Sequence, residues 1–140
     1  MINGDVSFWW HTLGGAPSAP ASTRLPLSAD TDADVAIVGA GYTGLWTAYY
    51  LKRAQPDLRV VILEQRFAGF GASGRNGGWL TNTVPGGREQ YVKTHGRDAA
   101  IAQQRALNDT VDEVIAVASR EGIDADIVKG GEFEVARSAA

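Results

Sequence analysis

Residues 35–51 read VAIVGAGYTGLWTAYYL and place three glycines, at spacings of two and three, between a β-branched run and a helix-like run. The apolar run at 35–38 predicts a buried strand, and the good helix formers at 43–54 predict a helix that Pro56 ends. A second apolar run at 59–63 predicts another strand. The order strand, helix, strand predicts two parallel strands with a right-handed crossover, and therefore an α/β fold.

The three glycines of this stretch permit a particular chemistry. Gly39 allows a tight strand-to-helix turn, Gly41 removes a Cβ that would block the close approach of a pyrophosphate, and Gly44 lets the helix pack against the strand. The helix then begins with free N–H groups and the positive end of its dipole facing an anion. We therefore expect a dinucleotide phosphate at this turn.

Glu64 follows the second predicted strand, 20 residues after Gly44. A carboxylate at this place can accept hydrogen bonds from both hydroxyls of an adenosine ribose, and it would repel a 2′-phosphate. Flavin and nicotinamide dinucleotides share this ADP-binding pattern, so the pattern alone leaves both cofactors open.

The stretch DVAIVGAGYTGLWTAYYLKR at 34–53, together with GFGASGRNGG at 69–78, resembles the FAD-dependent oxidoreductases of the D-amino-acid oxidase and glycine oxidase superfamily. The γ-glutamylputrescine oxidase-like members are the most similar in character. The resemblance implies a Rossmann-like FAD-binding unit with additional helices and the first strands of a substrate domain. It also implies FAD as cofactor and the oxidation of the C–N bond of a small-molecule amine or amino acid. The product would be an imine that water hydrolyses, with oxygen as electron acceptor.

The resemblance assigns binding roles to two groups of residues. The pyrophosphate and the adenosine ribose would be held by Gly39, Ala40, Gly41, Tyr42, Thr43, Gly44 and Glu64. The ribityl and flavin end would be wrapped by Gly71, Ala72, Ser73, Gly74, Arg75, Asn76, Gly77 and Gly78. The residue types agree with this, because small residues let amides approach a flat ring, Ser73 can donate to an oxygen, and Arg75 can offset an anion. No catalytic side chain is assigned, since in such a family most substrate contacts would lie beyond residue 140.

The chain divides by composition into three predicted parts: an N-terminal extension and linker at 1–33, the FAD-binding region at 34–121, and the start of an incomplete substrate domain at 122–140. In the first part, the aromatic triplet at 8–10 is expected to dock on a neighbouring surface. In the second, 66–87 reads as a long loop, which in a compact domain is usually functional or disordered. Residues 97–120 follow it as an amphipathic helix.

The last fifteen residues, DIVKGGEFEVARSAA, predict two short strand-like pieces around Gly130 and Gly131. Family members are much longer, so the chain reads as a fragment or a truncated relative. Phe133 and Val135 are then expected to be exposed. We expect the isolated chain to be marginally stable and inactive, and to bind FAD weakly or not at all.

Several functions are disfavoured by composition. The net charge is -3 and no Lys/Arg cluster is present, so neither a nucleic acid nor a membrane is expected as a partner. Cysteine is absent, and His11 and His95 lie far apart, so no metal site is expected. A soluble cytoplasmic protein is the expectation, with its oligomeric state open. Two alternatives remain: an NAD-binding dehydrogenase or reductase, and a truncated non-catalytic remnant or interaction module.

Overall fold

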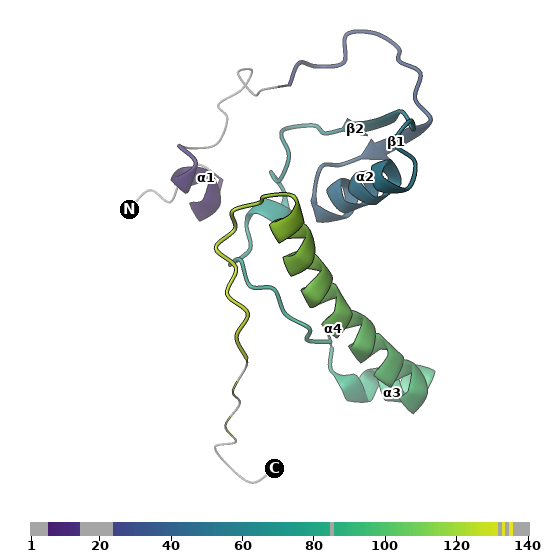
Figure 1. The fold of residues 1–140 in the computed structure, drawn as a ribbon, viewed down its shortest axis with the longest axis vertical. Helices are drawn as coiled ribbons and strands as arrows, with labels where there is room; N and C mark the ends of the chain where they lie inside the picture. Colours follow the sequence, from purple (N-terminus) through teal and green to yellow (C-terminus); the bar gives the residue numbers. More distant parts are fainter. Residues whose placement is uncertain (1–5, 15–23, 85, 132, 134, 136–140) are drawn as a thin grey trace. The chain divides into compact units, whose positions relative to one another are not determined.

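The computed structural model describes residues 6–14, 24–84, 86–131, 133 and 135. The chain forms two compact units, Met1–Gly78 and Trp79–Ala140 (Figure 1). The predicted three-part division remains a prediction. Within the described residues, no helix is long and apolar enough to cross a membrane.

The first unit is built on a β-α-β core. Its elements are helix α1 (Phe8–Thr12), strand β1 (Val35–Val38), helix α2 (Tyr42–Ala54), strand β2 (Val60–Leu63) and a 3₁₀ helix, η1 (Ala72–Gly74). The two strands pair in parallel, with Val35 opposite Val60 and Val38 opposite Leu63. Helix α2 forms the crossover between them and packs against both strands (Figure 1). The predicted order of strand, helix and strand is confirmed.

Close packing of α2 on β1 depends on Gly44. A Cβ at Gly44 would lie 2.1 Å from the carbonyl oxygen of Gly39 and 3.2 Å from Cγ2 of Ile37. Both distances are shorter than van der Waals contact, so only glycine fits. The prediction that Gly44 permits helix-on-strand packing is confirmed.

Strand β1 is half-buried on one face and exposed on the other, which corrects the prediction of a buried strand. Val35 and Ile37 are half-buried, whereas Ala36 and Val38 are exposed, Val38 at 87%. The reason is that Ile37 faces α2, while the described residues leave the opposite face of the strand open to solvent. A continuous apolar run cannot reveal which face is covered, since it carries no alternation.

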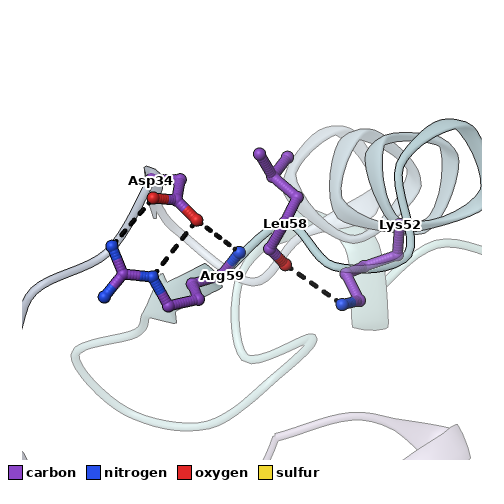
Figure 2. A network of polar contacts seen from close by, with 4 residues as sticks. All are labelled: Asp34, Lys52, Leu58 and Arg59. Carbon is purple, nitrogen blue, oxygen red and sulfur yellow. Dashed lines mark hydrogen bonds and ion pairs between the residues drawn. The ribbon is translucent and has the colours of Figure 1, made fainter.

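A polar clamp joins the strands at their amino ends (Figure 2). Asp34 Oδ1 accepts from Arg59 Nη2 at 2.8 Å, and Asp34 Oδ2 accepts from the backbone N–H of Arg59 at 2.8 Å. Lys52, near the end of α2, donates to the carbonyls of Leu58 and Pro56. The clamp therefore joins the C-terminal end of α2 and the starts of β1 and β2 to the turn between α2 and β2.

The second unit holds two helices, α3 (Arg88–His95) and α4 (Arg97–Arg120), which pack against each other. The predicted helix at 97–120 is confirmed, and Ala100, Val117 and Ala118 are its buried residues. Helix α3 is not predicted by the sequence pattern, because its eight residues REQYVKTH carry too few apolar side chains for a visible stripe. Gly96, with a φ of +84°, ends α3 and begins α4.

The described residues after α4 contain no strand, so the strand-like pieces predicted around Gly130 and Gly131 are corrected for this range. Residues 132, 134 and 136–140 lie outside the described residues. A strand is defined by a hydrogen-bonded neighbour, and the described residues supply none to this segment. Phe133 and Val135 are exposed at 90% and 67%, as expected.

Candidate functional site

The first glycine turn connects the end of β1 to the start of α2. Gly39 has a φ of +99°, in the left-handed region that favours glycine. Its N–H donates to the carbonyl of Leu63 at the end of β2, at 2.7 Å. Gly41 is the N-cap of α2 and provides no side-chain cap. The tight turn predicted at Gly39 is confirmed, and it leads into a helix whose own N-cap residue has no side chain.

The second glycine segment repeats the backbone geometry of the first. Residues 69–74 read GFGASG, with the same glycine spacing as GAGYTG at 39–44. Gly69 has a φ of +79°, and Gly71 is the N-cap of η1 without a side-chain cap. A Cβ at Gly74 would lie 2.0 Å from the carbonyl oxygen of Gly69. The repeated glycine spacing is visible in the sequence, but the sequence analysis predicts a loop at 66–87 and a flavin-binding role for 71–78 without predicting a second turn of this geometry.

Hydrogen bonds join the two glycine segments. The N–H of Gly69 donates to the carbonyl of Ala40 at 2.9 Å, and the N–H of Tyr42 donates to Ser73 Oγ at 2.9 Å. Asn76 Nδ2 donates to the Tyr42 hydroxyl at 3.2 Å. The structure thus brings together residues from both groups that the sequence assigns to cofactor binding.

Gly41 has a close neighbour that the sequence did not reveal. A Cβ at this position would lie 2.9 Å from Ser73 Oγ. Glycine at 41 therefore lets Ser73 reach the first N–H of α2, quite apart from the predicted approach of a pyrophosphate. Ser73 is half-buried and places a hydroxyl at this helix start.

Asn76 and Arg75 lie side by side in sequence and take different partners. Asn76 Oδ1 accepts from the N–H of Gly78 at 2.8 Å, and Asn76 Nδ2 also donates to the carbonyl of Ser73 at 2.8 Å. Arg75 Nε donates to the carbonyl of Phe70 at 2.8 Å, and its guanidinium lies 4.8 Å from the centre of the Phe70 ring. The Asn76 side chain thus stabilises the second segment through hydrogen bonds to residues of that segment. The Arg75 side chain packs on Phe70.

Glu64 lies beside the first glycine turn. One carboxylate oxygen accepts from the N–H of Ala40 at 2.9 Å, and the other accepts from the N–H of Arg66 at 3.0 Å. These backbone hydrogen bonds, that of Ala40 first, lower the pKa of Glu64 below its ordinary value. A charged carboxylate is therefore held at the end of β2, next to the turn, and its predicted role on a ribose stays a prediction.

The other predicted binding residues make fewer contacts. Thr43 is exposed in the first turn of α2, and Ala72 is exposed at the start of η1. A Cβ at Gly71 or Gly77 would meet no atom of the described residues within 4 Å. These positions leave backbone accessible, without a contact that defines a role.

The aromatic triplet at 8–10 docks on the second glycine segment, as the sequence predicted in general terms. Trp9 Nε1 donates to the carbonyl of Asn76 at 2.8 Å. The Trp10 ring meets the Phe67 ring edge-to-face, with centroids 4.7 Å apart. No pattern in the sequence indicates which surface these rings contact.

Comparison with known proteins identifies the family. Residues 34–140 match the family model described as FAD dependent oxidoreductase, DAO. The chain belongs to the DAO family of FAD-dependent oxidoreductases, and its cofactor is FAD. Both expectations from the resemblance are confirmed, and the choice between flavin and nicotinamide is decided for flavin.

Two similar bacterial proteins bear oxidoreductase names. The chain is 36% identical over 105 residues to the probable oxidoreductase OrdL of Haemophilus influenzae, covering 75% of this chain and 24% of that protein. It is 40% identical over 100 residues to gamma-glutamylputrescine oxidoreductase of Escherichia coli, covering 71% of this chain and 23% of that protein. The chain thus spans about a quarter of the length of these relatives. No solved structure matches the chain.

A third relative bears the name of a different activity. Thiamine thiazole synthase of Sclerotinia sclerotiorum is 44% identical over 79 residues, covering 54% of this chain and 23% of that protein. Similarity in this region therefore extends across proteins whose names describe different reactions. Similarity in this region therefore indicates the cofactor that is bound more than the substrate that is oxidised.

Proposed function

We propose that these residues form the N-terminal FAD-binding part of an oxidoreductase that oxidises the C–N bond of a small-molecule amine or amino acid. The observation that carries the proposal is that hydrogen bonds join the two glycine segments at the start of α2, directly after a parallel strand and at an N-cap that is itself a glycine. In this proposal β1, α2 and β2 are the first unit of a Rossmann-like fold. A cytoplasmic location and the absence of nucleic-acid and membrane partners belong to the same proposal.

The residues at the first turn fit a pyrophosphate. An α-helix leaves its first N–H groups without partners inside the helix, and Gly41 does not cap them with a side chain. Ser73 adds a hydroxyl at the same helix start, where it can donate its own proton to an anionic oxygen. We assign the pyrophosphate to 39–44 on this basis, with Ser73 as an additional donor.

Glu64 fits the adenosine ribose. Backbone hydrogen bonds keep its carboxylate ionised and beside Ala40, and an ionised carboxylate accepts well from hydroxyl groups. Its negative charge disfavours a 2′-phosphate at the same place. The assignment of Glu64 therefore supports a cofactor with an unmodified ribose, as FAD has.

The second segment fits the flavin end of the cofactor. Its glycines leave backbone accessible at 71 and 77, and Asn76 fixes the course of the chain by bonding its own neighbours. When bound, FAD supplies the acceptor for the hydride removed from the carbon that bears the amine, and oxygen is the proposed final acceptor. The contribution of this chain is to bind and orient the cofactor.

The experiment uses the full-length product of the gene, purified and titrated with FAD and with NAD. We expect flavin fluorescence to be quenched at a stoichiometry of about one, and NAD to compete weakly or not at all. The loaded protein is then offered gamma-glutamylputrescine, simple amines and amino acids, with hydrogen peroxide and ammonia as readouts. FAD binding without turnover of any of these would remove the C–N assignment and leave the cofactor assignment intact. A protein that binds neither dinucleotide would instead favour the non-catalytic remnant.

A further inference from the structure

Helix α1 lies on the second glycine segment through specific contacts. The indole N–H of Trp9 donates to the carbonyl of Asn76, and the neighbouring Trp10 packs its ring edge-to-face on Phe67. Ser7 begins this helix and accepts from the N–H of Trp10 at 3.4 Å. One hydrogen bond and one ring contact therefore anchor α1 at two points of 67–78.

The Trp9 ring also determines what can occupy position 78. Gly78 has a φ of +75°, and a Cβ there would lie 2.7 Å from Cζ2 of the Trp9 ring. The N–H of Gly78 donates to Asn76 Oδ1. The indole and the Asn76 amide thus both constrain the backbone of Gly78.

Asn76 connects this contact to the first glycine turn. Its Nδ2 donates to the carbonyl of Ser73 and to the hydroxyl of Tyr42, the first residue of α2. Ser73 in turn accepts from the N–H of Tyr42. A continuous set of hydrogen bonds therefore runs from Trp9 through Asn76 to the start of α2.

We propose that Trp9 is a positioning residue of the FAD site. It acts through Asn76 and Gly78, and holds 76–78 in the conformation that receives the flavin end of the cofactor. The inference rests on the proposed cofactor assignment of the second segment. It adds a residue from outside both glycine motifs, which is 40% exposed and whose indole N–H donates to a backbone carbonyl.

The test compares Trp9→Phe, which keeps a ring and removes the N–H donor, with Trp9→Ala, which removes both. Trp46→Phe is the matched control, because it makes the same change on α2, where the indole stacks on Tyr50. All variants are made in the full-length gene product. Two readouts need no cofactor: hydrogen exchange at the Gly78 amide and trypsin cleavage after Arg75. Two readouts use it: the Kd for FAD and the visible circular dichroism of the bound flavin.

We expect Trp9→Phe to raise the Kd for FAD about fivefold, the size of one lost hydrogen bond, and Trp9→Ala to raise it further. The rates of Gly78 amide exchange and of trypsin cleavage after Arg75 should rise in Trp9→Phe and rise further in Trp9→Ala. The visible circular dichroism of the bound flavin should change in both variants. Trp46→Phe should match the parent in every readout. Faster exchange with an unchanged Kd and dichroism would overturn the positioning role. An unchanged exchange rate at the Gly78 amide would show that Trp9 does not hold 76–78, and would overturn the inference. If Trp9→Ala fails to fold, the result for Trp9→Phe alone decides whether Trp9 positions the site. A parent protein that binds no FAD would reject the proposed function and this inference together, and it is recognised by the parent titration alone.

Discussion

Gly44 shows how a single missing side chain sets the geometry of the site. A Cβ there would lie 2.1 Å from a backbone oxygen, which cannot move aside as a side chain can. We predict that Gly44→Ala lowers the free energy of unfolding by about 2–3 kcal/mol, because the helix must move away from the strand. Chemical denaturation of the full-length product measures this.

Gly71→Ala is the matched control for that prediction. Gly71 has a φ of −76°, and within the part of the chain that the structure describes a Cβ there meets no atom within 4 Å. The free energy of unfolding should therefore change by no more than about 0.5 kcal/mol. An equal decrease in the free energy of unfolding of Gly44→Ala and Gly71→Ala would show that the close approach of Gly39 does not determine which residue fits at position 44.

Glu64 is the residue at which charge matters most for the cofactor assignment. We predict that Glu64→Gln raises the Kd for FAD about tenfold, because a neutral amide accepts hydroxyl protons less strongly than a carboxylate. Flavin fluorescence quenching measures the change, and Asp57→Asn serves as a control at an exposed acid of the same unit. An unchanged Kd would place the ribose elsewhere.

At the scale of elements, the clamp of Asp34 and Arg59 holds β1 to β2. The hydrogen bonds and charge of Arg59 lower the pKa of Asp34 from 3.8 to about 2. Because the pKa is lower in the folded state, the clamp contributes stability above about pH 4, and this contribution is lost as the pH falls towards 2. We predict that Asp34→Asn is less stable near neutral pH and loses less stability than the parent across that acid range.

Urea denaturation at a series of pH values measures the effect on the clamp. Asp32→Asn is the control, since the described residues show no ion pair for Asp32. If the free energy of unfolding falls equally with decreasing pH in Asp34→Asn and in the parent, the prediction is contradicted.

Elements with strong local signals could be predicted from the sequence, and contacts between distant segments could not. The apolar run at 35–38 and the amphipathic pattern at 97–120 encode their own structures, and both were found. Helix α3 has little apolar periodicity, so it was missed. The bond from Tyr42 to Ser73 joins residues 31 positions apart, and no local pattern specifies which serine approaches which amide.

At the scale of the whole molecule, the described residues bury little apolar surface. The buried apolar residues are Ala40, Val84, Ala100, Val117 and Ala118. Val38 and Phe133, by contrast, are exposed at 87% and 90%. Small cores give small stabilities, and exposed apolar side chains attract partners or cause aggregation.

We predict that the 140-residue chain, expressed by itself, unfolds at low denaturant and binds a hydrophobic dye. It should also purify without stoichiometric FAD. The full-length gene product serves as the comparison under the same conditions. Flavin absorbance at one equivalent in the isolated chain would contradict this expectation and show that the two glycine segments suffice for tight binding.

The paired glycine turns have a consequence at the level of the gene. Every single-base change that replaces a glycine introduces a residue with a Cβ or a stop codon, because all four codons that begin with GG encode glycine. At codons 44 and 74 each such substitution would direct that Cβ at the same kind of target, a backbone oxygen five residues earlier. These two codons should therefore be among the least tolerant in a saturation-mutagenesis survey, whereas codon 71, in the same loop, should accept alanine.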